Sequence, residues 1–345
     1  MKKITRAGIA IGGIAVGLLG AAVGFAQTQK LQQPEWAYAV TLEPAAPFSD
    51  DGTKYTVSDS TASFNRTQIA GRDQVNGIAD WDPADHPAMP RIVSHGDPGA
   101  RAIAACGLCH YANGKGRGEN AGVSGLSKDY IVQTLHDMAT GARKSSEPLK
   151  ANAIRMDGFA KNMTEEEITA AANYFSAIPW TPWIKVVEST TAPKVRSNAG
   201  LYVPVTGPGA GMEPLGDRII EVPVDPQHTE FLRDPHSPFI AYVPVGSVAK
   251  GKAIVTTGMD GKTLACSTCH GADLNGVGAI PAIAARSPSY VARQLNDFQQ
   301  GTRNGAMAAL MKPVVAKLTT EDILDISAYL ASLPAPATSM KVAGR

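Results

Sequence analysis

All four cysteines of this 345-residue chain lie in two copies of one short motif. The first copy is Cys-Gly-Leu-Cys-His at residues 106–110, and the second is Cys-Ser-Thr-Cys-His at residues 266–270. In an exported protein this pattern is typical of covalent haem c attachment: two thiols bond the haem vinyl groups and the adjacent histidine binds the iron. For a single copy, a redox dithiol or half of a zinc site would be the alternatives.

The sequence that follows each motif also repeats at a fixed offset. An offset of 160 residues relates Ser127 to Ser287. The first copy then contains five additional residues, so that an offset of 155 relates Met156 to Met311. Such a repeat indicates two duplicated domains with one motif each. A dithiol enzyme does not need this duplication, so we expect two covalent haem c groups. The predicted thioether residues are Cys106, Cys109, Cys266 and Cys269, and the predicted proximal iron ligands are His110 and His270.

Each copy has the sequence pattern of a small helical domain. The repeated serine is suited to cap a helix, and apolar residues follow it at helical spacing. A last helix is predicted to begin at Thr164, where Glu167 completes a capping box; Thr319 with Asp322 is the weaker equivalent in the second copy. Ile-Pro and Leu-Pro pairs, which end at residues 179 and 334, then terminate these helices.

With these motifs, each copy resembles a class I cytochrome c domain, with a haem helix, a middle helix, a methionine loop and a C-terminal helix. The match covers residues 91–179 and 248–334 and is similar to the tandem dihaem cytochromes of proteobacteria. The resemblance implies a mainly α fold of two such helical domains. A long Pro-rich extended segment (residues 180–247) joins them, an irregular arm (residues 27–90) precedes them, and a tail (residues 335–345) follows.

The joining segment has its own character. Residues 179–248 contain eleven prolines and four short strand-like pieces, which indicates extended chain with turns. These pieces span residues 184–187, 202–205, 218–222 and 239–243. The segment is too apolar for a flexible linker, so we expect it to pack over one or both haem domains.

The function of such a domain depends on the second axial ligand of the iron, because a closed iron carries electrons and an open one can react with small molecules. The candidates are Met138, Met156, Met163 and His136 in the first domain and Met307 and Met311 in the second. Met156 and Met311 occupy equivalent positions just before the last helix, so we predict these two as ligands. A thioether favours ferrous iron, which implies two fairly high reduction potentials.

Other polar residues receive weaker predictions. Arg143 and Arg303 follow the middle helices and are candidates for haem propionate contacts; a solvated arginine at a helix terminus is the alternative. Pro281 resembles the family proline whose carbonyl orients the proximal histidine, whereas the first copy has Ala121, so the two histidines are expected to be held differently. The remaining histidines are expected at the surface or in loops, and they are His86, His95, His228 and His236.

The N-terminus has the layout of an export signal. Lys2, Lys3 and Arg6 precede an uncharged stretch at residues 7–26, and small residues stand before a predicted cleavage site at Gln27. Residues 1–26 are therefore predicted to be a signal peptide, with a retained inner-membrane anchor as the alternative. Either reading indicates a periplasmic location.

The composition excludes some classes of function. Apolar residues make up 44% of the chain, which allows packed cores. The formal charge is +1 and there is no long basic run, so the sequence gives no indication of nucleic-acid binding. We expect a one-electron relay in a periplasmic or membrane-associated respiratory chain. Its donor would be a dehydrogenase or cytochrome complex, and its acceptor an oxidase or another cytochrome. The alternatives are an enzyme like the dihaem cytochrome c peroxidases and the electron-transfer subunit of a dehydrogenase.

Overall fold

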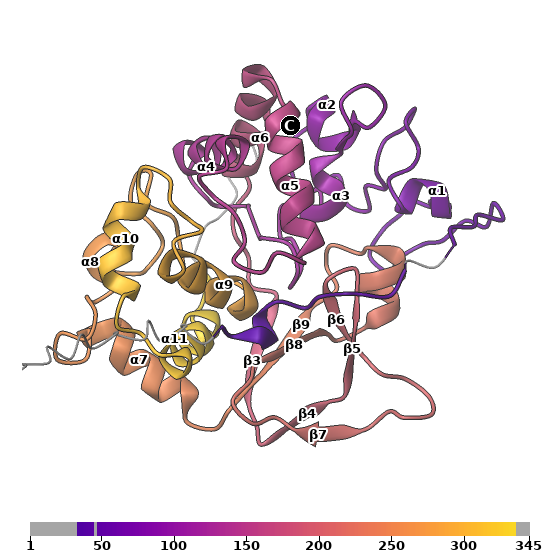
Figure 1. Ribbon diagram of the computed structural model, residues 1–345. Helices are drawn as coiled ribbons and strands as arrows, with labels where there is room; N and C mark the ends of the chain where they lie inside the picture. Colours follow the sequence, from indigo (N-terminus) through magenta and orange to yellow (C-terminus); the bar gives the residue numbers. More distant parts are fainter. Residues whose placement is uncertain (1–32, 45–46, 336–345) are drawn as a thin grey trace, which may run out of the picture. The chain divides into compact units, whose positions relative to one another are not determined.

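The computed structural model describes residues 33–44 and 47–335 (Figure 1). The predicted signal peptide or anchor at residues 1–26 lies outside the described residues, as does nearly all of the predicted tail. Within the described part, no helix is long and apolar enough to cross a membrane.

The described chain is mainly α-helical, and short strands lie chiefly between the two copies of the repeat. The helices are η1 (Glu35–Ala37), α1 (Arg66–Ile69), α2 (Arg91–Ser94), α3 (Cys106–His110), α4 (Lys128–Thr140), α5 (Ala151–Asn162), α6 (Glu165–Ala177), η2 (Gln227–Leu232), α7 (Ser247–Thr257), α8 (Ser267–His270), α9 (Pro288–Gln299), α10 (Ala308–Val315) and α11 (Thr320–Ser332). The strands are β1 (Gly96–Asp97), β2 (Ile103–Ala104), β3 (Ile184–Glu188), β4 (Thr191–Pro193), β5 (Val195–Asn198), β6 (Leu201–Pro204), β7 (Met212–Pro214), β8 (Ile220–Pro223) and β9 (Phe239–Val243).

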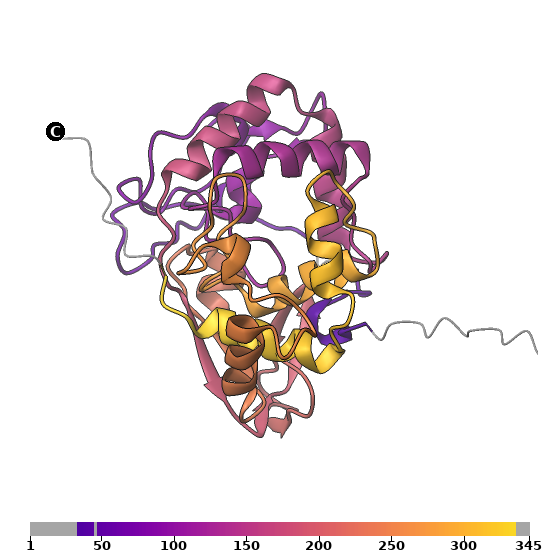
Figure 2. The ribbon, with the colours of Figure 1, turned by 90° about the vertical axis from the view of Figure 1, so that its left-hand side faces the viewer.

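The helix signals of the sequence are confirmed. Ser127 and Ser287 accept hydrogen bonds from the backbone N–H three residues on, at the starts of α4 and α9. Both predicted capping boxes are complete, and α6 and α11 follow them. Their apolar faces are buried in two separate cores, one for each copy. The magenta helices of the first copy and the yellow helices of the second form two groups in both views (Figures 1 and 2).

The repeat extends to the backbone angles. Left-handed φ values occur at residues 111, 114, 116, 125 and 141 and again 160 residues later at 271, 274, 276, 285 and 301. In one of these pairs, the equivalent of Gly114 is Leu274, whose φ is +59°. A leucine adopts this conformation only at a cost, so the fold of the second loop imposes it.

The expected methionine loops are helical in the structure. Met156 lies in α5 and Met311 lies in α10. Ala151, Ala153 and Ala160 favour a helix around Met156, whereas α10 forms although it contains Pro313.

The joining segment forms the strands between the domains. Strands β3, β9 and β8 make a sheet in which β3 is parallel to β9 and β8 is antiparallel to it. Ile184 and Val186 of β3 pack against the core of the second copy. Trp180 donates from its indole N–H to the Ala285 carbonyl at 3.2 Å, and its ring lies against Gly122 of the first copy. The segment thus packs over both copies, as expected.

The arm before the first copy is irregular apart from two short pieces. Its 3₁₀ turn η1 packs against α9 of the second copy. There the Tyr38 hydroxyl lies 2.8 Å from the Ser146 hydroxyl of the first copy and donates to Asp297 of the second at 2.9 Å. The arm therefore links the two copies through a buried polar contact.

Candidate functional site

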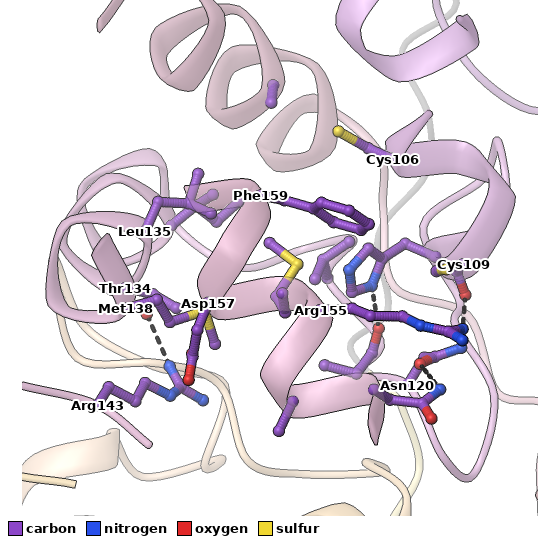
Figure 3. Close-up of a pocket in the computed structure, with 18 of the residues that line it drawn as sticks. Cys106, Cys109, Asn120, Thr134, Leu135, Met138, Arg143, Arg155, Asp157 and Phe159 are labelled. Carbon is purple, nitrogen blue, oxygen red and sulfur yellow. Dashed lines mark hydrogen bonds between the residues drawn. The ribbon is translucent and has the colours of Figure 1, made fainter. Parts of the chain in front are cut away.

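The first motif opens onto a cavity of about 270 Å³. Figure 3 shows Cys106 and Cys109 on one side of this cavity, with Met138 and Arg143 on the opposite side. His110 and Met156 also line it, and its walls are mainly apolar side chains such as Ile131. The structure thus brings both thiols, the histidine and the predicted thioether ligand of the first copy to one cavity.

The proximal histidines are held in the same way in the two copies. The Nδ1–H of His110 donates to the Ala121 carbonyl, and that of His270 donates to the Pro281 carbonyl, each at 2.8 Å. This bond leaves Nε2 as the atom that can bind iron. Burial lowers the pKa of both histidines, so each imidazole is neutral. The expected difference between Ala121 and Pro281 is absent from this contact, because any residue supplies a carbonyl.

All four cysteines are available for haem attachment. None of the four forms a disulfide. Burial raises the pKa of Cys106 to about 12 and that of Cys266 to about 11. Burial therefore disfavours the thiolate form of these two residues, which metal binding and disulfide exchange would require.

The structure removes one of the four candidates for the second axial ligand in the first domain. Met138, Met156 and Met163 all line the first cavity, whereas His136 does not line it and pairs with Glu165 at 3.1 Å. In the second copy, Met311 packs against the same core as Cys266. Met307 is 47% exposed. Met156 and Met311 are compatible with this geometry, but the choice of Met156 over Met138 and Met163 rests on the repeat and stays a prediction.

Arg143 and Arg303 meet at the boundary between the copies. Arg143 is buried and donates to the Tyr290 hydroxyl at 2.9 Å; Arg303 donates to the Tyr130 hydroxyl at 2.9 Å. Since the 160-residue offset relates both the arginines and the tyrosines, these contacts are related by an approximate two-fold axis. Burial contradicts the alternative of a solvated Arg143, and the propionate contacts stay a prediction.

Sequence reasoning missed a buried charged pair in the first copy. Arg117 and Glu119 form a 2.6 Å ion pair, with side chains 8% and 0% exposed. Glu119 also lines the cavity. The 160-residue offset places Val277 and Ala279 at these positions in the second copy, so charge at a repeat position that is otherwise apolar was the signal available in the sequence.

The remaining histidines lie away from the cavity. His236 pairs with Asp85 at 2.9 Å and His228 with Asp234 at 2.8 Å. His86 and His95 lie in loops, with His86 buried against Asp80, and His228 is partly exposed in η2, which agrees with the expected surface or loop positions. The first cavity has none of these four among its lining residues.

The residues of the first cavity fit a covalently held haem. They supply two thiols, a neutral imidazole with one nitrogen free, a thioether and apolar walls. They also include Lys150, whose ammonium is buried and has no hydrogen-bond partner within the described residues. The second copy repeats the thiols, the oriented imidazole and the thioether.

Comparison with known proteins agrees with this arrangement. The family model for cytochrome c matches residues 248–334. Cytochrome c-554(548) of Halomonas halodenitrificans is 40% identical over 68 residues, which are 19% of this chain and 82% of that protein. The chain belongs to the cytochrome c family. This cytochrome is a tandem dihaem protein of class I type, carries two covalently bound haem c groups and transfers electrons.

Two further relatives extend the comparison. Cytochrome c4 of Pseudomonas aeruginosa is 23% identical over 240 residues, which are 68% of this cytochrome and 87% of the relative. A thiosulfate dehydrogenase electron acceptor of Stutzerimonas stutzeri is 37% identical over 91 residues, which are 26% of this cytochrome and 41% of that protein.

Proposed function

We propose that this cytochrome is a one-electron relay whose two haem irons are each closed by a histidine and a methionine. The haems are held by Cys106 and Cys109 in the first domain and by Cys266 and Cys269 in the second. The axial pairs are His110 with Met156 and His270 with Met311. The observation that carries the proposal is the arrangement of the first cavity, where both thiols, the oriented His110 and Met156 line one apolar space.

The protein's contribution is orientation and exclusion of water. When bound, haem supplies an iron that alternates between ferrous and ferric states. The carbonyls of Ala121 and Pro281 fix the histidine rings, so that little has to move when the charge on the iron changes. The thioethers favour the ferrous state, and the apolar walls do the same because they disfavour additional charge. Neither domain then has an open iron for peroxide or dioxygen.

The contacts between the domains support transfer from one haem to the other. Besides the reciprocal Arg–Tyr contacts, the Lys144 N–H donates to the Thr302 carbonyl at 2.9 Å and the Asn304 N–H donates to the Ala142 carbonyl at 2.6 Å. Backbone hydrogen bonds of this kind hold the loops after α4 and α9 together. A fixed spacing between the two haem sites suits a relay, which must pass each electron internally.

We further propose that the protein works in the periplasm with protein redox partners. The basic N-terminus and the uncharged stretch at residues 7–26 support export, either as a cleaved signal or as an inner-membrane anchor. The donor is a dehydrogenase or cytochrome complex, and the acceptor is an oxidase or another cytochrome in a respiratory chain.

Covalent attachment is the first test of this proposal. Mass spectrometry should find two haems on the denatured protein, one on each of the peptides that contain residues 106–110 and 266–270. Extraction of either haem by acidified acetone would contradict attachment in that domain.

A second test separates the relay from a peroxidase. The fully reduced wild-type protein should be reoxidised only slowly by hydrogen peroxide and should bind carbon monoxide poorly, because Met156 or Met311 has to be displaced first. It should exchange electrons rapidly with a small soluble cytochrome. Fast, saturable peroxide reduction, particularly after half-reduction, would overturn the relay and favour the peroxidase-like enzyme.

The similarity to a thiosulfate dehydrogenase electron acceptor favours a second, narrower candidate. In this version the donor is a thiosulfate-oxidising dehydrogenase, and the cytochrome is its soluble or permanently bound acceptor. Stopped-flow reduction by such an enzyme with thiosulfate, compared with reduction by the enzyme without thiosulfate, tests it. A rate that does not depend on thiosulfate removes this candidate and leaves the general relay intact.

A further inference from the structure

Lys150 is a buried cation without a partner at the edge of the first cavity. The residue is 4% exposed, precedes α5 and lines the cavity. Its Nζ has no hydrogen-bond partner within the described residues. Burial, together with the nearby Arg293 guanidinium, lowers the pKa of Lys150 to about 7. An ammonium in this position is costly unless an anion joins it.

The carboxylates that interact electrostatically with Lys150 already have other hydrogen-bond or ion-pair partners. Glu119 is paired with Arg117 at 2.6 Å. Asp297 accepts hydrogen bonds from the Tyr38 hydroxyl at 2.9 Å and from the Ser146 N–H at 2.9 Å. Glu147, the third carboxylate that acts on Lys150, accepts hydrogen bonds from the Gln33 side chain and from the Leu149 N–H. None of the three forms an ion pair with Nζ within 4.0 Å in the described chain, so Nζ is left for an anion from elsewhere.

A haem supplies such an anion. Its two propionate carboxylates project from the ring edge that lies away from the vinyl groups, and the thioethers of Cys106 and Cys109 would fix the vinyl edge. Arg143 lies across the cavity from these cysteines (Figure 3). Its Nη atoms already donate to Thr134, Tyr290 and Gln294, whereas all three N–H donors of Lys150 are free.

We propose that the Lys150 ammonium is the counter-ion of a propionate of the first haem. The inference rests on the proposed attachment of that haem to Cys106 and Cys109. At the offset that relates Met156 to Met311, the second domain has Gly305 in place of Lys150. The counter-ion is therefore a property of the first haem alone, and it raises the potential of that haem because a nearby positive charge favours the ferrous state.

The test is a redox titration of the haem-loaded protein with spectra that resolve the two haems. Lys150→Gln should shift the ferrous–ferric equilibrium of the first haem about tenfold toward ferric, which is about 59 mV for one electron, and leave the second haem unchanged. Lys150→Arg should retain the wild-type potential. Lys161→Gln is the matched control, since Lys161 is exposed and lies in the α5 helix that Lys150 precedes, and it should shift neither haem.

Two further measurements sharpen the test, and the second of them does not depend on how well the glutamine variant folds. The propionate bending mode in the resonance Raman spectrum should differ between wild-type protein and Lys150→Gln but not between wild-type protein and Lys161→Gln. In a crystal structure of the haem-loaded wild-type protein, Nζ should lie within hydrogen-bond distance of a propionate oxygen. A separation beyond 4 Å, as in an ordinary unpaired ammonium, would overturn the proposal.

Two other outcomes also overturn the inference. One is an unchanged potential of the first haem in Lys150→Gln. The other is the loss, in Lys150→Gln, of a low-spin species with an amine ligand, which would make Lys150 an iron ligand. Failure of the underlying function looks different. If peptide mass analysis finds no haem on Cys106 and Cys109, the proposed attachment is wrong and the counter-ion falls with it. If the haem is attached and its potential does not respond to Lys150→Gln, only the counter-ion is wrong.

Discussion

The loops that follow the two haem motifs have the same backbone conformation, but the first is buried and the second is largely exposed. Residues 111–120 are almost all buried, whereas most of residues 271–280 are exposed or half-buried. The first loop carries the Arg117–Glu119 ion pair, and the second has Val277 and Ala279 there. The left-handed positions and the histidine hydrogen bond are nevertheless the same in both.

Segments outside the repeat cause this difference. Arg233 of the joining segment donates a hydrogen bond to the Leu108 carbonyl within the first motif. Asn113 of the first loop donates to Asp85 of the N-terminal arm at 2.9 Å. The second loop has no such bond to either segment within the described residues. Since both domains have the same predicted ligands, we expect the potentials to differ through burial and charge and not through the ligands.

Exchange of the axial ligand should have the largest effect and should be equal in the two domains. Met156→His or Met311→His should lower the potential of its own haem by on the order of 0.2 V, within the ~0.8 V range that axial ligands cover. The other haem should stay nearly unchanged. Spectroelectrochemical titration of each variant measures this. If Met307→Ala removes the sulfur-to-iron charge-transfer band and Met311→Ala does not, the assignment from the repeat is wrong.

Removal of the buried ion pair should affect only the first domain. Glu119→Ala leaves the Arg117 cation buried and alone, so the free energy of unfolding should fall by about 3–5 kcal/mol. The first haem should become easier to reduce because a nearby negative charge is lost. Urea denaturation and a redox titration check both effects.

The exposed pair of Lys250 with Glu321, 2.7 Å apart in the second domain, is the control for this variant. Glu321→Ala should leave the urea midpoint nearly unchanged, because solvent screens an exposed ion pair. Equal losses for the two variants would mean that the burial of the first loop has no energetic consequence.

The boundary between the domains should respond symmetrically. Arg143→Ala and Arg303→Ala each remove charged hydrogen bonds to a tyrosine and to Gln294, so each should cost about 1.5–3 kcal/mol. Urea unfolding should change from one transition toward two, because the domains lose coupling. A single transition with an unchanged midpoint in both variants would show that these contacts do not join the domains.

The smallest effect concerns a carboxyl group that only the second domain has. Burial raises the pKa of Asp325 in α11 to about 6, and its equivalent at the 155-residue offset is Ala170. The folded state then binds a proton more readily than the unfolded state, so this group's contribution to stability falls as pH rises from about 4 to about 6. Asp325→Asn should remove that dependence. Urea midpoints of wild type and variant at several pH values measure it, and parallel curves would contradict it.

The helices, their caps and the two haem motifs could be predicted because they depend on residues close in sequence. Ser127, Thr164 and their equivalents each bond a backbone N–H three residues away, and such local rules are visible in the sequence. The repeat then selected Met156 over His136, and the structure turns His136 away toward Glu165. Among the features that depend on nearby residues, only the helical conformation of the segments around Met156 and Met311 was not predicted.

The environment of the sites could not be predicted because it depends on distant segments. Glu119 is buried by parts of the chain that the sequence pattern left unplaced, and Arg143 meets Tyr290 across 147 residues. Lys150 gives no motif at all: only its burial without a partner marks it. Contacts between residues far apart in the chain produce no regular spacing of residue types that could be recognised in the sequence.

The most direct test of the central claim is an anaerobic redox titration in which near-infrared magnetic circular dichroism follows the sulfur-to-iron charge-transfer band. Two haems with His/Met ligation should give two one-electron steps, each removing one of two contributions to that band, with unequal midpoints. A single contribution, or a step that leaves a high-spin haem, would mean that one iron lacks its methionine and would contradict the account.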